Sequence, residues 1–299
     1  MMPLASPLAR IHLALAGALL GIAFAAAAHA QSYPEARRIV SVGGSVTEII
    51  AALGALDRVV ARDTTSSYPP RVEELPDVGY MRALSPEGVL STRPDLVIAE
   101  EGSGPPETLE VLRAASVPFV EVPEGFDTEA VADKVRIVAA TLGLDEAGEA
   151  LVRDIDDRLT AARDSARAAT GDTPPRVLFI LSIQGGRILA AGRDTAAAGI
   201  IDLAGGQNAV TAFAGYKPLT DEALAAAAPQ VILMMDRSGD HAADDDALFA
   251  HPALTTTPAA RTGSVVRMDG LLLLGFGPRT PDAVERLSEA LAQTVADAE

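Results

Sequence analysis

The sequence has no cysteine and no tryptophan, and its 299 residues include only four histidines and four tyrosines. Without cysteine the chain forms no disulfide, and it offers no thiol to which a lipid could be attached. Only His241 and His251 lie beyond residue 30, so a zinc site built from several histidines is not expected. Because these residue types are scarce, each tyrosine and histidine near a candidate site is informative.

Positive charge is also scarce. The chain has 24 lysines and arginines against 41 aspartates and glutamates, which gives a net charge of −17. Such an acidic chain repels nucleic acid and anionic membrane surfaces, so neither is expected as a partner. Enzyme motifs are missing as well. No Gly-x-Ser-x-Gly elbow occurs, and the Gly-Gly-Ser run at 43–45 has the spacing of neither nucleotide-binding motif.

The first 30 residues have the pattern of a secretory signal peptide. Arg10 is their only charge, an apolar run covers 11–28, and Ala28-His29-Ala30 forms a small-x-small cleavage pattern. Cleavage after Ala30 leaves 269 residues with a net charge of −18, because the positive charge of Arg10 is lost. We expect a soluble periplasmic protein. The alternative is a transmembrane anchor, against which the Ala- and Gly-rich composition of the run argues.

The mature chain predicts an α/β fold, because short β-branched runs alternate with helical stretches rich in Ala and Leu. The runs lie at 38–42, 58–61, 95–99, 118–122, 176–181 and 231–235. A long helical stretch at 128–169, with a weak point at Gly143, separates two halves. We therefore predict an N-terminal lobe at 31–145, a connecting helix at 146–172 and a C-terminal lobe at 173–299.

The two halves contain a repeat. Leu-Ser-Pro-Glu at 84–87 and Leu-Thr-Asp-Glu at 219–222 stand 135 residues apart, and each precedes a helix, a proline and a strand. Ser85 and Thr220 are good N-caps, and the proline favours an extended start to the strand. Two similar α/β lobes joined by a long helix predict a ligand cleft between them.

Several of these segments resemble a known family. Arg-Ile-Val-Ser at 38–41, Leu-Ser-Pro-Glu at 84–87 and Arg-Pro-Asp-Leu-Val at 93–97 are similar to the helical-backbone class of ABC-transporter solute-binding proteins. Gly-Tyr-Met-Arg at 79–82 and Gly-Tyr-Lys-Pro-Leu at 215–219 resemble its periplasmic haem-binding branch. The resemblance implies two Rossmann-like lobes on one rigid helix, with a haem bound and released without turnover.

The resemblance assigns the haem iron to Tyr80, with Arg82 supporting the tyrosinate and Met81 among the haem contacts. A phenolate oxygen suits ferric iron, and a nearby arginine favours the charged form of a tyrosine. Arg82 can return to the side of Tyr80 in an extended segment, because side chains alternate there. The alternatives are a cleft-rim tyrosine that only packs, and a surface ion pair between Arg82 and Glu87.

The second half offers further contacts for a flat apolar ring with two carboxylates. Tyr216 and Lys217 lie at the equivalent lip of the second lobe. Arg237 follows the strand at 231–235, and α/β clefts bind ligands at the carboxyl ends of strands. Met235 is adaptable toward flat apolar ligands. Arg237 could instead be a solvated loop residue, and Met235 could be a core residue of its strand.

Other ligands and other classes of protein are open alternatives. His241 is a rival or second axial ligand, although its acidic stretch is typical of a solvated loop. Some haem binders of this type use a histidine near 181–186, and its absence here argues against a His-assisted or two-haem site. Within the class, a ferric siderophore or a corrinoid is the alternative ligand. Outside it, an α/β enzyme and an adhesion protein are the remaining alternatives.

Glu87 and Glu222 carry a separate expectation that follows from the resemblance. In this class an acidic residue on each lobe docks into the inner-membrane permease, which works with an ATPase, and these two glutamates occupy the matching positions. The symmetry of the repeat suits a two-fold transporter. Both residues would also lie in a first helical turn, where they stabilise the helix dipole. The binding protein itself is expected to be a monomer.

Overall fold

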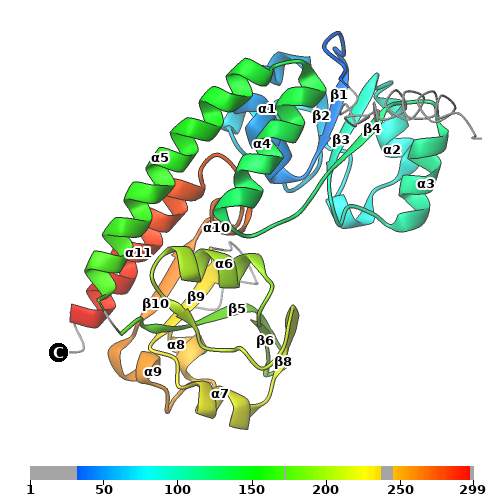
Figure 1. Ribbon diagram of the computed structural model, residues 1–299. Helices are drawn as coiled ribbons and strands as arrows, with labels where there is room; N and C mark the ends of the chain where they lie inside the picture. The colour runs from blue at the N-terminus through cyan, green and yellow to red at the C-terminus, as the bar shows by residue number, and fades with distance from the viewer. Residues whose placement is uncertain (1–31, 172, 237–244, 297–299) are drawn as a thin grey trace, which may run out of the picture. The chain divides into compact units, whose positions relative to one another are not determined.

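Four parallel strands form the first of two sheets, in the order β2-β1-β3-β4 (Figure 1). The computed structural model describes residues 32–171, 173–236 and 245–296. β1 and β3 are buried along their whole length, as is usual for continuous apolar runs inside a parallel sheet. The strands are β1 (Ile39–Val42), β2 (Val59–Arg62), β3 (Leu96–Glu100) and β4 (Phe119–Val122).

Helices and short 3-10 turns connect these strands. Two of the helices have side-chain caps: the Ser85 hydroxyl accepts the N–H of Gly88 at 3.3 Å, and the Asp127 carboxylate accepts that of Ala130 at 2.8 Å. The elements are α1 (Gly44–Ala52), α2 (Pro86–Ser91), α3 (Pro106–Ala114), α4 (Thr128–Leu142), η1 (Leu56–Arg58), η2 (Pro70–Glu74) and η3 (Met81–Ala83).

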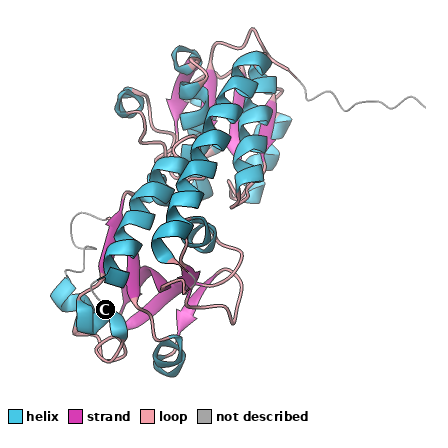
Figure 2. Ribbon diagram, turned by 60° about the vertical axis from the view of Figure 1, so that its left-hand side comes forward, coloured by secondary structure: helices cyan, strands magenta, loops and turns pink. Residues whose placement is uncertain are grey.

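The long helical stretch consists of two helices. α4 ends at Leu142, and Gly143 has a φ of 69°, a left-handed conformation that glycine tolerates. The longer helix is α5 (Asp145–Thr170), which packs along α11 (Thr280–Ala296), and the two run side by side in both views (Figures 1 and 2). A long helix is therefore present where the connecting helix is predicted, while the lobe boundaries stay predictions.

The second sheet is mixed. Its main order is β10-β9-β5-β6-β8, and β7 pairs with β5. β10, β9 and β5 are parallel, whereas β5, β6 and β8 are joined in antiparallel pairs. The strands are β5 (Arg176–Gln184), β6 (Arg187–Ala191), β7 (Gln207–Asn208), β8 (Tyr216–Leu219), β9 (Val231–Met235) and β10 (Val265–Met268). The helices of this half are α6 (Ala196–Leu203), α7 (Asp221–Ala227), α8 (Asp245–Phe249), α9 (Pro258–Thr262) and α10 (Gly270–Leu274).

The segment between α10 and α11 packs into the first half of the chain. The ring of Phe276 meets that of Phe126 edge to face, with centroids 5.6 Å apart. Arg279 Nε donates to Glu48 Oε1 at 3.0 Å, and the carboxylate is buried. Burial raises the pKa of Glu48, while the hydrogen bond and charge of Arg279 lower it. These contacts tie the end of the chain to α1.

The predicted α/β class, with two sheets and one long helix, is confirmed. One large core cluster contains residues of α1, α4, α5, α6 and α11, so the helices that flank the two sheets share their apolar packing. Within the described ranges, no helix has both the length and the apolar character needed to span a membrane.

Candidate functional site

Tyr80 lies in a turn between β2 and β3, two strands of the first sheet. Gly79 precedes it with a φ of 99°, and Tyr80 itself is extended, with φ −72° and ψ 134°. The 3-10 turn η3 follows at once, closed by the N–H of Ala83 donating to the Tyr80 carbonyl at 2.8 Å. The side chain of Tyr80 keeps 45% of its surface exposed. A large aromatic side chain this exposed is available to a ligand.

Arg82 contacts the Tyr80 hydroxyl, although it lies in the 3-10 turn η3 and not in the extended segment that the sequence predicts. Its Nη1 donates to the Tyr80 oxygen at 3.4 Å, which is at the long end of hydrogen-bond distances. The alternative for Arg82, an ion pair with Glu87, is not formed in the part of the chain that the structure describes. The Arg82 guanidinium therefore lies next to the Tyr80 hydroxyl, and both side chains are exposed.

Met81 anchors the turn. Its side chain is 8% exposed and packs in a core cluster with Val78 and Leu84. Its carbonyl accepts the N–H of Gly104 at 2.9 Å. Met81 therefore points into the first lobe, and Tyr80 and Arg82 are the exposed members of the Gly-Tyr-Met-Arg motif.

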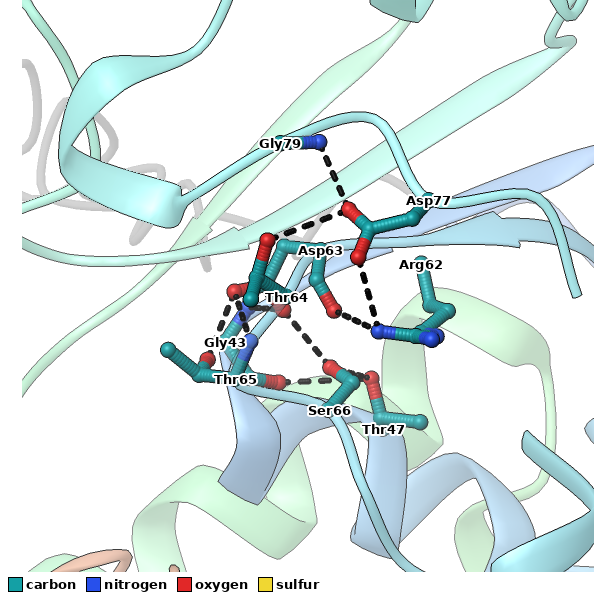
Figure 3. A network of polar contacts seen from close by, with 9 residues as sticks. All are labelled: Gly43, Thr47, Arg62, Asp63, Thr64, Thr65, Ser66, Asp77 and Gly79. Carbon is teal, nitrogen blue, oxygen red and sulfur yellow. Dashed lines mark hydrogen bonds and ion pairs between the residues drawn. The ribbon is translucent and has the colours of Figure 1, made fainter. Parts of the chain in front are cut away.

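A dense polar network lies beneath this turn (Figure 3). Asp63 is completely buried, and its carboxylate accepts hydrogen bonds from the N–H of Gly43 at 2.9 Å, the hydroxyl of Thr65 at 2.6 Å and the hydroxyl of Ser66 at 2.7 Å. Asp77 accepts the N–H of Gly79, next to Tyr80. Both oxygens of the buried Asp63 carboxylate therefore have hydrogen-bond donors.

Sequence reasoning missed this network, although one signal for it was present. Aspartate two residues before glycine, as in Asp77-Val78-Gly79, is typical of a turn in which the side chain bonds its own backbone two residues on. Asp63 bonds Thr65 and Ser66 in its own loop, whereas its bond from the Gly43 N–H spans 20 residues and no local pattern marks it.

Tyr216 begins the edge strand β8 and is 37% exposed. Its ring meets that of Phe179 edge to face, with centroids 6.3 Å apart. Burial raises the pKa of Tyr216 above 10.0, and hydrogen bonds from the Ala197 backbone and the Thr195 side chain partly oppose the rise. The charge of Arg82 also lowers this pKa, so Arg82 and Tyr216 lie within electrostatic range of each other.

Glu124, which sequence reasoning did not single out, lies in the same electrostatic environment. Its pKa is raised first by burial and then by the charge of Glu100, and the positive charges of Lys134 and Arg82 lower it. The charge of Glu124 in turn raises the pKa of Tyr216. The charge of Arg82 thus lowers the pKa of both Glu124 and Tyr216.

The structure does not place Lys217 beside the Tyr216 phenol. Neighbouring side chains of a strand leave opposite faces of the sheet, and the Lys217 ammonium lies over the ring of Phe213 at 5.6 Å. Met235 ends β9 and is half-buried against the core. Arg237 and His241 lie outside the described residues.

His251 is engaged by backbone on both sides of its ring. Its Nε2 lies 2.8 Å from the carbonyl oxygen of Gly186, and its Nδ1 accepts the N–H of Ala253 at 3.2 Å. Among the described residues, no group of three or more histidines, cysteines, aspartates or glutamates could hold a metal ion.

Glu87 and Glu222 occupy matching places in the two halves. Each is exposed in the first turn of its helix, α2 or α7. The N-caps predicted for these helices are confirmed, since Ser85 caps α2 and the Thr220 hydroxyl accepts the N–H of Ala223 at 3.2 Å. The repeat is thus present in the structure as two equivalent helix starts.

Comparison with known proteins agrees with this arrangement. Residues 39–271 match the family described as periplasmic binding protein. Similar solved structures include those of two periplasmic heme-binding proteins. The periplasmic heme-binding protein BhuT in complex with two hemes is 44% identical, over 86% of this chain and 98% of that one, with a TM-score of 0.82. The apo form of the periplasmic heme-binding protein RhuT from Roseiflexus sp. RS-1 is 41% identical, over 87% and 99%, also with a TM-score of 0.82.

A curated relative is more distant. The uncharacterized ABC transporter substrate-binding lipoprotein YvrC of Bacillus subtilis is 27% identical over 86% of this chain and 80% of its own length. The family match covers well over half of the sequence, and the solved structures align along nearly all of their length. The chain therefore belongs to the periplasmic binding protein family, whose members bind ligands and are not enzymes.

Proposed function

We propose that the protein binds haem, ferric protoporphyrin, in the periplasm and delivers it to an ABC-transporter permease. The observation that carries the proposal is the exposed Tyr80 with the Arg82 guanidinium 3.4 Å from its hydroxyl. The similar structures of BhuT and RhuT are both described as periplasmic heme-binding proteins, which supports the same ligand for this chain.

The chemistry of the pair suits ferric haem. A tyrosine oxygen is a hard ligand that ferric iron accepts in an axial position. To bind, the hydroxyl must lose its proton, and a neighbouring guanidinium favours the charged phenolate. In this proposal the Tyr80 oxygen is the axial ligand of the haem iron, and Arg82 stabilises the negative charge of the phenolate.

Other residues complete the proposed haem site. Tyr216 approaches from the second half, within electrostatic range of Arg82. Lys217 and Arg237 are the cations proposed for the two propionates, and Met235, at the carboxyl end of β9, is proposed to contact the porphyrin. Met81 supports the site from below, because it is buried under the turn.

Delivery to a permease requires a docking surface and export. Glu87 and Glu222 are proposed to dock the two lobes onto an inner-membrane permease, because they are exposed at equivalent helix starts. A signal peptide cleaved after Ala30 would bring the chain to the periplasm. The proposed lobes are 31–145 and 173–299, on either side of the connecting helix at 146–172.

The test is a titration of the purified mature protein with ferric haemin, followed by visible absorption. The expected result is saturable binding with a high-spin, tyrosinate-type spectrum. Matched titrations with a corrinoid and a ferric siderophore serve as controls. Saturable binding of either control, with no specific binding of haemin, would overturn the haem proposal and identify the alternative ligand.

A further inference from the structure

We propose that Asp77 is a positioning residue for Tyr80, because its carboxylate fixes the Gly79 peptide from which the tyrosine emerges. The inference rests on the proposed role of Tyr80 as the axial ligand of haem. It concerns how the protein holds this ligand in place before haem arrives.

Both oxygens of the Asp77 carboxylate are engaged (Figure 3). Oδ1 accepts the N–H of Gly79 at 2.7 Å and the hydroxyl of Thr64 at 3.2 Å. Oδ2 accepts Nη1 of Arg62 at 3.0 Å. The carboxylate is therefore held from β2 and its extension while it holds the residue next to Tyr80.

The backbone around Asp77 pairs with the end of β2 through an isolated parallel β-bridge between Asp77 and Arg62. The N–H of Arg62 donates to the Pro76 carbonyl at 2.9 Å, and the N–H of Val78 donates to the Arg62 carbonyl at 2.9 Å. One step further, the N–H of Thr64 donates to the Gly79 carbonyl at 3.0 Å. Gly79 is thus fixed at both ends, with its N–H bound by Asp77 and its carbonyl bound by Thr64.

Gly79 is also the residue at which the chain changes direction. Its φ of 99° lies in the region that favours glycine. Because glycine adopts positive and negative φ about equally well, local contacts must stabilise this conformation. Tyr80 follows directly, and its φ and ψ are those of an ordinary extended residue. A change in the Gly79 dihedrals would therefore swing the phenol without straining Tyr80 itself.

The support beneath Asp77 is mostly buried and hydrogen-bonded. The Arg62 side chain is 12% exposed, and its Nη1 also donates to the Asp63 carbonyl at 3.1 Å. Asp63 is itself buried, and its carboxylate receives the N–H of Gly43 at the start of α1. A continuous set of hydrogen bonds therefore leads from the centre of the first sheet to the turn that carries Tyr80.

A role in global stability does not account for this arrangement. The Asp77 side chain is 39% exposed, and ion pairs with an exposed partner contribute little to folding. Partners that orient a metal ligand from behind typically change metal affinity by about 10- to 100-fold when they are removed. We therefore expect removal of Asp77 to change haem affinity much more than it changes folding stability.

The experiment compares Asp77→Ala, Asp77→Asn and a control, Asp95→Ala, in the full mature chain. Asp95 also accepts backbone N–H groups, those of Arg37 and Arg38, each at 2.9 Å. It precedes β3, at the end of the parallel sheet opposite to the Tyr80 turn. The readouts are the rate of haem transfer to apomyoglobin, the visible spectrum of the ferric complex, and the thermal melting of the apoprotein.

For Asp77→Ala we expect haem loss to speed up by about 10- to 100-fold, with weakened tyrosinate bands. Asp77→Asn should lie between this variant and the wild type, because an amide oxygen still accepts the Gly79 N–H. Asp95→Ala should keep the wild-type spectrum and rate, even if its melting temperature falls.

Two results would overturn the inference: wild-type haem loss and spectrum in Asp77→Ala, or equal changes in Asp77→Ala and Asp95→Ala. The wild type and Tyr80→Phe are titrated first, which separates the inference from the proposed function. If the wild type does not bind haemin, the proposed cargo is wrong and this inference falls with it. If the Tyr80→Phe complex is unchanged, Tyr80 is not the axial ligand, and this inference falls as well. Loss in Tyr80→Phe with a normal Asp77→Ala removes the inference alone.

Discussion

Tyr80 and Tyr216 stand near equivalent points of the two halves, yet their surroundings differ. Each precedes a capped helix, α2 or α7, that carries an exposed glutamate. Tyr80 is the more exposed of the two and has a guanidinium at its hydroxyl. Tyr216 starts an edge strand, packs its ring against Phe179, and has a pKa raised by burial. The repeat therefore supplies two tyrosines, of which one has an arginine at its hydroxyl.

The difference shows which parts of a repeat carry function. The helix starts match because capping and strand geometry constrain both halves alike. The tyrosines do not match because their environments come from non-repeated contacts, Asp77 and Arg82 for the first and Thr195 and Phe179 for the second. Fold symmetry is thus compatible with a ligand held mainly from one side.

The largest expected effect comes from removing the phenol oxygen of Tyr80. Tyr80→Phe should weaken ferric haem binding by more than about 100-fold, because loss of a ligand exceeds the 10- to 100-fold typical of its supporting partners. Tyr216→Phe should cost less than about tenfold. Titrations of both variants with haemin measure the difference, and equal losses would remove the asymmetry between the two halves.

A smaller effect is expected for the cations near the two tyrosines. Arg82→Ala should weaken haem binding by about tenfold, since it removes the guanidinium at the Tyr80 hydroxyl. Lys217→Ala is the matched change in the second half and should cost less, because that ammonium lies over Phe213. Haem dissociation rates of the two variants give the comparison, and a larger effect for Lys217→Ala would contradict it.

The smallest expected effect concerns the proton of Tyr216. Its pKa is raised by burial and by the charge of Glu124, and lowered by the Ala197 and Thr195 hydrogen bonds and by Arg82. The folded state therefore keeps this proton more tightly than the unfolded chain, so Tyr216 reduces stability as the pH rises past 10.0. Tyr216→Phe removes that loss.

The measurement is urea unfolding of the wild type and Tyr216→Phe at pH values below and above 10. The free energy of unfolding of Tyr216→Phe should rise relative to that of the wild type only above pH 10. The phenolate absorbance of folded Tyr216 should appear at a higher pH than that of an ordinary tyrosine. A difference in unfolding free energy that is independent of pH would show that the Tyr216 proton is held no more tightly in the folded state.

Much of the fold follows from local sequence patterns. β9 occupies the predicted residues 231–235, and the first-sheet strands fall within a residue or so of their predicted positions. The mixed second sheet was not predicted, although Gly185-Gly186 between β5 and β6 is a recognised hairpin signal. The break after α4 was only partly foreseen, as a weak point at Gly143, because composition alone does not tell a bend from two helices.

The candidate site is less readable from sequence. The motif at 79–82 indicates Tyr80 and Arg82, and the hydrogen bond between them is consistent with that interpretation. The motif does not say that Met81 is buried or that Lys217 turns toward Phe213, because both depend on tertiary packing. Asp63 lies far in sequence from Gly43 and its role appears only in the folded chain.

The most direct test of the account is to record resonance Raman spectra of the ferric haem complexes of the wild type, Tyr80→Phe and Tyr216→Phe side by side. The account predicts iron–tyrosinate bands in the wild type and in Tyr216→Phe, and their loss in Tyr80→Phe. Tyrosinate bands that persist in Tyr80→Phe and vanish in Tyr216→Phe would contradict it, and would place the iron on the second half of the chain.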